Sequence, residues 1–229
     1  CGYVVGTAPK IKSHLFCGTV LSGRYMLGKV LGHGGFGITY IAWDKKLNRP
    51  VAVKEFFPNA FSTRSEGESE VSCFDDKSSD FFREGVRKML DEGTRLSKFS
   101  DNENIVNIYD CFEENKTAYI VMEYVDGASI RKIIKAKGRF DEQSALKIVL
   151  KVAEALLAAE KMKIVHRDIK PDNIMMTTDG EVKLADLGIA KSNSGNENVE
   201  LTNPQTMLGT IAYISPEQAS DAQSVDSRA

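Results

Sequence analysis

The sequence has few cysteines and no long apolar run. Its four cysteines, Cys1, Cys17, Cys73 and Cys111, are scattered along 229 residues and form no CxxC pair. This spacing indicates neither a zinc site nor a disulfide framework, and it favours a reducing, cytoplasmic compartment. No stretch of about 18 apolar residues is present, so no segment of the chain is expected to cross a membrane. A signal peptide is not visible either.

A strong excess of charge of either sign is also absent. The chain has 30 Lys and Arg against 32 Asp and Glu, which gives a formal net charge of -2. This balance gives no sign of attraction to nucleic acid or to a membrane surface. With 42% hydrophobic and 27% charged residues, the composition is typical of a globular protein. The length suffices for one large domain or for two lobes with cores of their own.

Residues 1–22 contain several glycines and little hydrophobic periodicity, and are interpreted as a leader. The chain starts with Cys1-Gly2 and has no initial methionine, which suggests that another module precedes it. A Cys-Gly ending would suit the last knuckle of a zinc ribbon. A fragment boundary is the simpler explanation.

Short runs rich in β-branched and aromatic residues follow the leader. YMLGKVL, FGITYIAW and PVAVKEF predict three antiparallel strands, and NIVNIYDCF and TAYIVMEYV predict two more. A helix is expected from about Asp80 to Phe99, where apolar residues recur at helical spacing. Residues 56–80, rich in serine and acids, are interpreted as a long, mobile surface connection, parts of which are expected to pack through Phe56, Phe57, Phe61 and Phe74. Residues 23–125 are therefore expected to form a five-stranded antiparallel lobe with one helix.

The remaining residues, 126–229, have a mainly helical pattern. SIRKIIKAK ends at Gly138, and Asp141 is placed to cap a helix that runs to about Lys163. NIMM and EVKLAD predict a hairpin around Asp179-Gly180. The predicted fold class is α+β, with an antiparallel first lobe and a mainly helical second lobe.

Three glycines form the first candidate site. Gly32, Gly34 and Gly37 in LGHGGFGITY satisfy GxGxxG, which is a weak signal alone because dinucleotide-binding folds share it. Those folds place the glycines between a strand and a helix, whereas here a strand pattern lies on both sides. A glycine-rich hairpin can fold over phosphates, because its backbone approaches without Cβ interference. A turn that binds nothing is equally compatible with these residues.

Lys54 in VAVKE is the second candidate. A lone strand lysine is usually only solvated. However, Glu92 lies between Met89 and Leu96 on the apolar stripe of the expected helix, and an acid on an inward face needs a partner. Lys54 is the candidate partner because its strand leads towards that helix.

The third candidate is HRDIKPDN, residues 166–173. Asp168 lies five residues before Asn173 and eighteen before Asp186, which begins DLG. Loops beside a hairpin could bring these side chains to one point, where Asn173 and Asp186 would suit Mg²⁺ as oxygen ligands. Asp168 could then orient a hydroxyl. Three unrelated loop residues remain the alternative.

Taken in order, these motifs resemble a known family. GHGGFG, VAVK, Glu92, VMEYVDG, HRDIKPDN, DLG and GTIAYISPE follow one another as in bacterial eukaryotic-type (Hanks-type) serine/threonine protein kinases. Each motif alone is weak, but their ordered occurrence from about Arg24 to the last residue is highly specific. The resemblance implies a bilobal protein-kinase-like fold and phosphorylation of protein hydroxyls.

The resemblance implies ATP and Mg²⁺ as cofactors. The glycine turn would cover the ATP phosphates, and Lys54, held by Glu92, would contact the α- and β-phosphates. Met122 resembles the gatekeeper, and Glu123 to Val125 resemble the hinge that holds adenine. The implied ATP-binding positions are Leu31, Gly32, Gly34, Gly37, Thr39, Ala52, Lys54, Met122, Glu123 and Val125.

The resemblance also assigns roles in the reaction. Asp168 would accept the proton of the substrate hydroxyl, and Lys170 would neutralise the transferring phosphoryl group. Thr210 in GTIAY, with Lys170, resembles the Ser/Thr rather than the Tyr branch. The implied catalytic set is Asp168, Lys170, Lys54, Glu92 and Thr210, with Asn173 and Asp186 as the metal ligands.

Arg167 suggests regulation, because a cation beside the catalytic acid invites an anion. Phosphate on Thr202 or Thr206 could supply it, with Ser192 and Ser194 as weaker candidates. The expected partners are protein substrates with Ser or Thr acceptors, and a second copy of the chain for phosphorylation in trans. Nucleic acid is not expected as a partner. The expected location is cytoplasmic, which allows a membrane anchor outside this chain.

The sequence departs from the family pattern in a few places. DLG replaces the commoner DFG, and Thr39 stands where a valine usually packs under adenine. Ser215 replaces an alanine, and the connection 56–80 is unusually long. The family continues beyond Ala229 into further helices, so we expect a domain that is truncated at its C-terminal end, with a second lobe that folds poorly alone.

Two alternatives remain beside the kinase interpretation. A pseudokinase scaffold that binds ATP is disfavoured because every catalytic position is intact. A small-molecule phosphotransferase is disfavoured by GTIAYISPE, which in kinases shapes a shelf for a peptide.

Overall fold

The computed structural model describes residues 9, 11–98, 102–187, 212–220 and 226. The chain divides into two compact units. The N-terminal unit comprises Cys1–Ser100 and Asn107–Tyr124, and the C-terminal unit comprises Asp101–Val106 and Val125–Ala229. None of the helices in the described ranges combines the length and the apolar character that crossing a bilayer requires.

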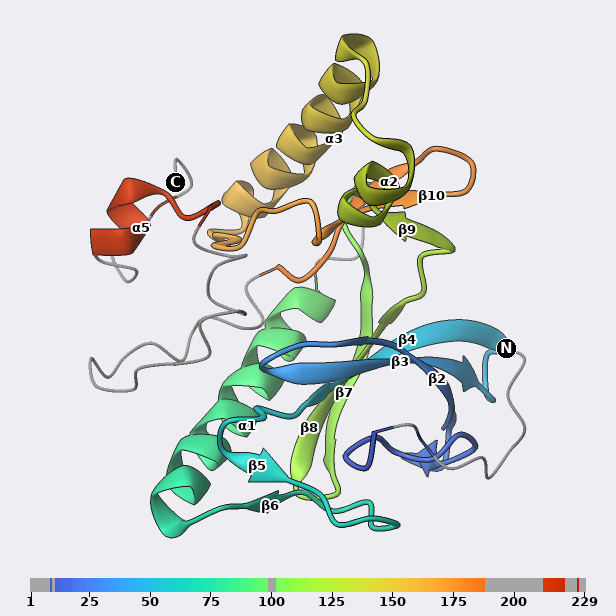
Figure 1. Cartoon of the computed structure of the whole chain (residues 1–229), viewed down its shortest axis with the longest axis vertical. Helices are drawn as coiled ribbons and strands as arrows, with labels where there is room; N and C mark the ends of the chain where they lie inside the picture. The colour runs from blue at the N-terminus through green and yellow to red at the C-terminus, as the bar shows by residue number, and fades with distance from the viewer. Residues whose placement is uncertain (1–8, 10, 99–101, 188–211, 221–225, 227–229) are drawn as a thin grey trace. The chain divides into compact units, whose positions relative to one another are not determined.

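The N-terminal unit is built on an antiparallel sheet with the strand order β1-β2-β3-β4-β8-β7 (Figure 1). The five predicted strands are all present, and a short sixth strand, β1, joins the edge of the sheet. The strands are β1 (Val20–Leu21), β2 (Tyr25–His33), β3 (Gly37–Asp44), β4 (Arg49–Phe56), β7 (Ile108–Glu114) and β8 (Thr117–Glu123).

Strand β1 comes from the segment that the sequence analysis assigned to the leader. Leu21 pairs with Tyr25, and the turn between them is closed by a hydrogen bond from Arg24 N to Leu21 O. Ser22 and Gly23 both have positive φ, at 49° and 62°, as the two central residues of a tight hairpin turn require. The end of the leader is therefore part of the fold.

Helix α1 (Asp76–Ser97) packs on one face of this sheet (Figure 1). It begins four residues before the predicted start, because Asp75 caps it by accepting a hydrogen bond from Ser78 N. Glycines allow a close approach of the helix: a Cβ on Gly93 would lie 3.1 Å from Cys111 Cβ and 3.3 Å from Ile120 Cδ1. The predicted helix is thus confirmed, and its contact is with β7 and β8.

The connection between β4 and α1 is anchored rather than a free excursion. It contains two short strands, β5 (Ser62–Thr63) and β6 (Ser72–Cys73), which pair with each other. Phe57, Arg64 and Val71 are buried, although Phe74 is 60% exposed. The expectation that parts of this segment pack therefore agrees with the burial of Phe57 but not with the exposure of Phe74, and the buried Arg64 and Val71 show that its central part is not confined to the surface.

The C-terminal unit contains a three-stranded sheet and helices. Its elements are β9 (Gly127–Ser129), α2 (Ile130–Lys137), α3 (Glu142–Lys161), β10 (Ile174–Thr177), β11 (Val182–Leu184) and α5 (Pro216–Ser220). The sheet has the order β11-β10-β9. A small apolar core joins α2, α3 and β11 through Ile130, Ile148, Val152 and Val182.

Local signals in this unit are confirmed. Asp141 caps α3 by accepting from Ser144 N, and Gly138, with φ 86°, ends α2. Gly180, with φ 95°, makes the turn between β10 and β11. These elements fix both ends of the polar segment 164–173, which leads into β10.

Candidate active site

The glycine motif forms the turn between β2 and β3. Gly32 pairs with Thr39 and His33 with Ile38, and the hydrogen bond from Gly34 N to Gly37 O is 2.9 Å long. The turn therefore has a strand on each side, as the sequence predicted. This arrangement differs from the strand-to-helix glycine turn of dinucleotide-binding folds.

The three glycines are present for different reasons. A Cβ on Gly37 would lie 2.4 Å from the backbone oxygen of Glu55, so the pairing of β3 with β4 requires glycine there. A Cβ on Gly32 would meet nothing within 4 Å, and one on Gly34 would only reach Gly37 O at 4.0 Å. Contacts within the described protein do not require these two glycines, which leaves room for a ligand to approach.

Lys54 shares its face of the sheet with the residues that α1 covers. Directly opposed residues of an antiparallel pair project to the same side, and Lys54 is opposed to Thr39 on β3 and to Ile120 on β8. Ile120 lies beneath Gly93 of α1, where a Cβ on the glycine would come within 3.3 Å of the Ile120 side chain. Lys54 therefore lies on the face of the sheet that carries α1.

Glu92 is next to Gly93 on the buried stripe of α1 and is 8% exposed. Its Oε1 accepts from Arg95 Nη2 at 3.2 Å. Because Gly93 packs against Ile120, the partner of Lys54, Glu92 and Lys54 belong to the same layer between helix and sheet. The Lys54–Glu92 couple stays a prediction that this placement supports.

The adenine-binding candidates lie on the central strands and at the start of the C-terminal unit. Ala52 on β4 pairs with Met122 on β8, and both are buried. Glu123, at the end of β8, donates its N–H to Asn107 O at 2.8 Å, and its Oε2 accepts from Asn107 Nδ2 at 3.1 Å. Val125 is the first residue of the C-terminal unit after β8 and is 9% exposed. Leu31 and Thr39 are half-buried on β2 and β3.

The opposite face of β4 carries a buried polar cluster that the sequence analysis did not identify. Glu55 forms an ion pair with Arg64, and both side chains are fully buried. Tyr40 and Tyr119 donate their hydroxyl protons to Glu55 at 3.0 and 2.7 Å. Burial and the Glu55 carboxylate raise the pKa of both tyrosines, so both phenols remain donors.

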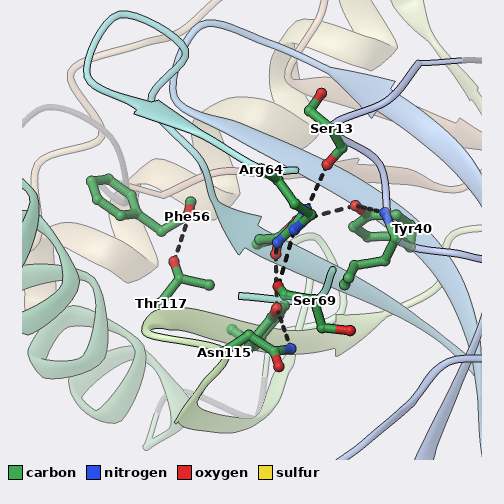
Figure 2. Close-up of polar contacts among 10 residues, drawn as sticks. Ser13, Tyr40, Phe56, Arg64, Ser69, Asn115 and Thr117 are labelled. Carbon is green, nitrogen blue, oxygen red and sulfur yellow. Dashed lines mark hydrogen bonds and ion pairs between the residues drawn. The ribbon is translucent and has the colours of Figure 1, made fainter. Parts of the chain in front are cut away.

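Arg64 also binds the backbone of two further segments (Figure 2). It donates to Ser69 O at 3.0 Å and to Ser13 O in the leader. Its place as one of two basic residues, with Lys77, in the acidic connection 56–80 was the only signal in the sequence for this role. Arg64 joins the leader, the connection and β4 at the residue that follows Lys54.

In the C-terminal unit, Asp168, Lys170 and Asn173 converge. Lys170 Nζ lies 2.7 Å from Asp168 Oδ2. Asn173 Nδ2 donates to the same Oδ2 at 3.0 Å and to Asp168 O at 2.8 Å. One carboxylate oxygen therefore receives two donors, one of them cationic, which fixes the orientation of the Asp168 side chain.

Ala185 connects this loop to Asp186. Ala185 N donates to Asn173 O at 2.8 Å, and Ala185 O accepts from His166 Nε2 at 3.0 Å. Ile174 pairs with Leu184, so Asn173 and Ala185 occupy adjacent ends of β10 and β11. Asp186, the next residue, is thereby held beside the Asp168–Asn173 loop.

His166 is buried and neutral in this network. Its Nε2 donates to Ala185 O, and its Nδ1 accepts from Asp168 N at 3.2 Å. Burial lowers the pKa of His166, because the charged imidazolium would lose its hydration. A second proton on Nδ1 would also face the Asp168 N–H. The histidine thus connects the two acidic segments through their backbone.

Two non-glycine residues here have left-handed backbone conformations. Arg167 has φ 62° and Asp186 has φ 59°. Such conformations cost roughly 1–3 kcal/mol each and are found where tertiary contacts enforce them, often at functional sites. Both residues adjoin the hydrogen bonds described above, which supplies that enforcement.

The last residue of GTIAY contacts α2, and the segment that follows it contacts the same loop. Gln218 Nε2 donates to Arg167 O at 2.9 Å, and Tyr213 OH accepts from Arg131 Nη2 at 2.7 Å. Arg131 Nε also lies 3.2 Å from Asp172 Oδ2. No motif in the sequence had indicated these contacts. Thr210 and the expected phosphorylation positions Thr202, Thr206, Ser192 and Ser194 lie outside the described residues.

The donor set of this loop fits Mg²⁺. Within the described part of the chain, no three His, Cys, Asp or Glu side chains gather closely enough to hold a metal by themselves. Mg²⁺ does not need such a cage, because it is usually held by one or two carboxylates together with water and substrate phosphates. The amide nitrogen of Asn173 donates its hydrogen bonds to Asp168. The other side-chain atom, Oδ1, is an oxygen that can serve as a ligand for Mg²⁺ beside Asp186.

The N-terminal unit, an antiparallel sheet with Lys54 and one helix, has the organisation of the first lobe of the eukaryotic-type kinase fold. The C-terminal unit, with its polar loop around Asp168, has the organisation of the second lobe. This is the class of protein that the fold and the site define. A family profile described as "Protein kinase domain" matches residues 25–228, and the chain belongs to this family.

Named relatives agree with this assignment. The chain is 38% identical over 202 residues to a probable serine/threonine-protein kinase of Clostridium perfringens, covering 88% of this chain and 26% of the relative. It is 36% identical over 205 residues to the serine/threonine-protein kinase PrkC of Bacillus subtilis, covering 90% and 28%. The chain thus spans about a quarter of the length of these relatives.

A solved structure shares the fold. The apo form of PpkA-294 superimposes with a TM-score of 0.73 at 25% sequence identity, over 79% of this chain and 64% of that chain. The resemblance to bacterial eukaryotic-type serine/threonine kinases and the bilobal α+β fold class are therefore confirmed.

Proposed function

We propose that the chain is the catalytic domain of a kinase that transfers the γ-phosphoryl group of ATP to serine and threonine hydroxyls of proteins. The observation that carries the proposal is the placement of Asp168, with its Oδ2 held between Lys170 Nζ at 2.7 Å and Asn173 Nδ2 at 3.0 Å. The relatives named above are serine/threonine-protein kinases, which supports the acceptor class.

The N-terminal unit supplies nucleotide binding in this proposal. The turn with Gly32 and Gly34 lies over the phosphates, where the absence of Cβ atoms allows backbone N–H groups to approach. Lys54 contacts the α- and β-phosphates and is oriented by Glu92. Gly37 belongs to the same glycine turn, and the remaining ATP-binding positions are Leu31, Thr39, Ala52, Met122, Glu123 and Val125.

The C-terminal unit supplies the chemistry. Asp168 accepts the proton of the incoming hydroxyl, and Lys170 stabilises the charge on the transferring group. Asn173 and Asp186 hold Mg²⁺, which neutralises phosphate charge when it is bound. Because phosphoryl transfer needs little covalent participation of the protein, orientation of these groups carries most of the rate enhancement.

Regulation by phosphorylation completes the proposal. Arg167 adjoins Asp168, and its carbonyl is held by Gln218 from the segment after GTIAY. A phosphate on Thr202 or Thr206 would pair with Arg167 and order that segment. Phosphorylation between two copies of the chain, in the cytoplasm, is part of this proposal, and Thr210 acts with Lys170 at the acceptor.

The test is phosphoryl transfer from [γ-³²P]ATP and Mg²⁺ to casein and to the chain itself. Asp168→Asn and Lys54→Met serve as matched variants. Wild-type transfer to serine and threonine, reduced at least about 100-fold in both variants, is the expected result. Tight ATP binding without transfer would instead identify a pseudokinase scaffold. Transfer to small alcohols or antibiotics but not to protein would identify a small-molecule phosphotransferase.

A further inference from the structure

We propose that Asn59 and His14 are positioning residues for the glycine-rich turn, acting through His33 and through the turn backbone. Both residues lie outside the strands that carry the turn: His14 in the leader, and Asn59 in the connection after β4. The proposal rests on the proposed function, because it assigns these residues to the nucleotide affinity of the same site.

The turn His33–Phe36 is bound at every residue by these outside segments. His33 Nδ1 lies 3.0 Å from His14 Nε2, and His33 Nε2 lies 3.1 Å from Asn59 Oδ1. Asn59 Nδ2 donates to Gly34 O at 3.2 Å, and Asn59 N donates to Gly35 O at 3.2 Å. Phe57 N donates to Phe36 O at 3.0 Å.

The partners fix the direction of each hydrogen bond. Gly34 O can only accept, so the amide nitrogen of Asn59 faces it and Asn59 Oδ1 faces His33. Asn59 Oδ1 then accepts from His33 Nε2, which makes Nδ1 of a neutral His33 an acceptor. His14 Nε2 must therefore donate. The result is a series of hydrogen bonds with one direction, in which His14 donates to His33, His33 donates to Asn59, and Asn59 donates to the backbone of the turn.

His14, the first donor of this series, is fixed in the core of the N-terminal unit. His14 is 8% exposed, and its neighbours Ser13 and Leu15 bind Arg64 and Tyr40 respectively. Arg64 and Tyr40 both bind Glu55, the neighbour of Lys54. The same framework therefore holds the strand of Lys54 and, through His14, the glycine-rich turn.

This geometry predicts an effect on nucleotide binding. A turn that hydrogen bonds already hold in one conformation loses less conformational freedom when phosphates bind than a turn that is free to move. Without the hydrogen bonds of Asn59, the turn would have to be ordered by ATP itself, which weakens binding while the groups at Asp168 are unaffected. The bonds to Asn59 are solvent-exposed, so the loss is modest, about threefold to tenfold in affinity.

The experiment measures steady-state kinetics of the full chain for Asn59→Ala, His14→Phe and His14→Gln. We expect Asn59→Ala and His14→Phe to raise KM for ATP about threefold to tenfold, with kcat within about twofold of wild type. His14→Gln, whose amide nitrogen can donate in place of Nε2, restores KM. Lys12→Ala, an exposed leader residue paired with Glu66, is the matched control and leaves KM unchanged.

Hydrogen exchange without nucleotide supplies a readout that does not depend on activity. The amides of Gly34, Phe57 and Asn59 should exchange faster in Asn59→Ala and in His14→Phe, and as slowly as wild type in His14→Gln. Unchanged KM and exchange, or losses of kcat and thermal stability with KM unchanged, would overturn the proposal. A wild-type chain that transfers no phosphate contradicts the proposed function instead. Hydrogen exchange then tests by itself whether His14 and Asn59 hold the glycine-rich turn.

Discussion

Glu55 and Arg64 form an ion pair whose two side chains are completely buried within the N-terminal unit. Tyr40, Tyr119, Ser13 and Ser69 complete the hydrogen bonding of this pair. The pair joins β4, immediately after Lys54, to the long connection between β4 and α1.

Breaking this pair should destabilise the protein strongly. Arg64→Met leaves the Glu55 charge buried without its partner, which costs about 3–5 kcal/mol of unfolding free energy. The double change Glu55→Gln with Arg64→Met should recover part of the loss. Urea denaturation measures both. The control is Arg83→Met, which breaks an exposed pair with Asp80 and should change stability by less than about 1 kcal/mol. Equal effects of Arg64→Met and Arg83→Met would contradict the burial of the pair.

Two glycines of the same motif should respond differently to alanine. Gly37→Ala places a Cβ 2.4 Å from Glu55 O, so the strands must separate, and we expect a loss of at least about 2 kcal/mol. Gly32→Ala meets nothing within 4 Å and should stay within about 0.5 kcal/mol of wild type. Thermal unfolding distinguishes them. Under the proposed function, Gly32→Ala should raise KM for ATP despite its normal stability.

The stability of the turn after β3 should depend on acidic pH through Asp44. Hydrogen bonds from Arg24, Leu47 N and Lys46 N hold the pKa of Asp44 at about 2, below its ordinary 3.8. Since the folded-state pKa is depressed, this contribution is complete above about pH 4 and is lost as the pH falls towards 2.

Comparison with Asp44→Asn isolates this contribution. We expect the variant to be about 1 kcal/mol less stable than wild type at pH 7, and the difference to shrink as the pH falls from 4 to 2. Asp91→Asn, which removes an exposed partner of Arg87, is the control for loss of a surface ion pair and should leave stability at pH 7 close to that of wild type. A difference that is constant between pH 7 and pH 2 would contradict the assignment.

Asn173→Asp should disable the polar loop of the C-terminal unit. The change replaces an amide donor by a carboxylate that faces both Asp168 O and Asp168 Oδ2, so repulsion replaces two hydrogen bonds. Phosphoryl transfer should fall at least about 100-fold and stability by about 1–3 kcal/mol. The neighbouring Asp172→Asn, at an exposed residue paired with Arg131, should leave transfer within about twofold. Similar losses in both variants would remove the special role of Asn173.

Much of the fold follows from short-range patterns in the chain. The alternation in PVAVKEF predicted β4, and Asp179-Gly180 predicted the turn between β10 and β11. Gly138 predicted the end of α2, and Asp141 predicted the start of α3. Other expectations were less successful. Residues 1–22 were interpreted as a leader, but Leu21 of β1 pairs with Tyr25 of β2. Two paired residues are too short a run to show the alternating pattern of a strand.

By itself, the sequence determined the order of the strands and helices, because each pattern depends on residues only a few positions apart. It also determined the order in which Asp168, Asn173 and Asp186 follow one another. Only the tertiary structure decided that Arg64 enters the core and that His14 and Asn59 reach the glycine-rich turn. Arg64 lies 9 positions from Glu55, and His14 and Asn59 lie 19 and 26 positions from His33. No local propensity encodes these contacts, because a buried charge or a histidine pair is stable only where the completed fold supplies its partner.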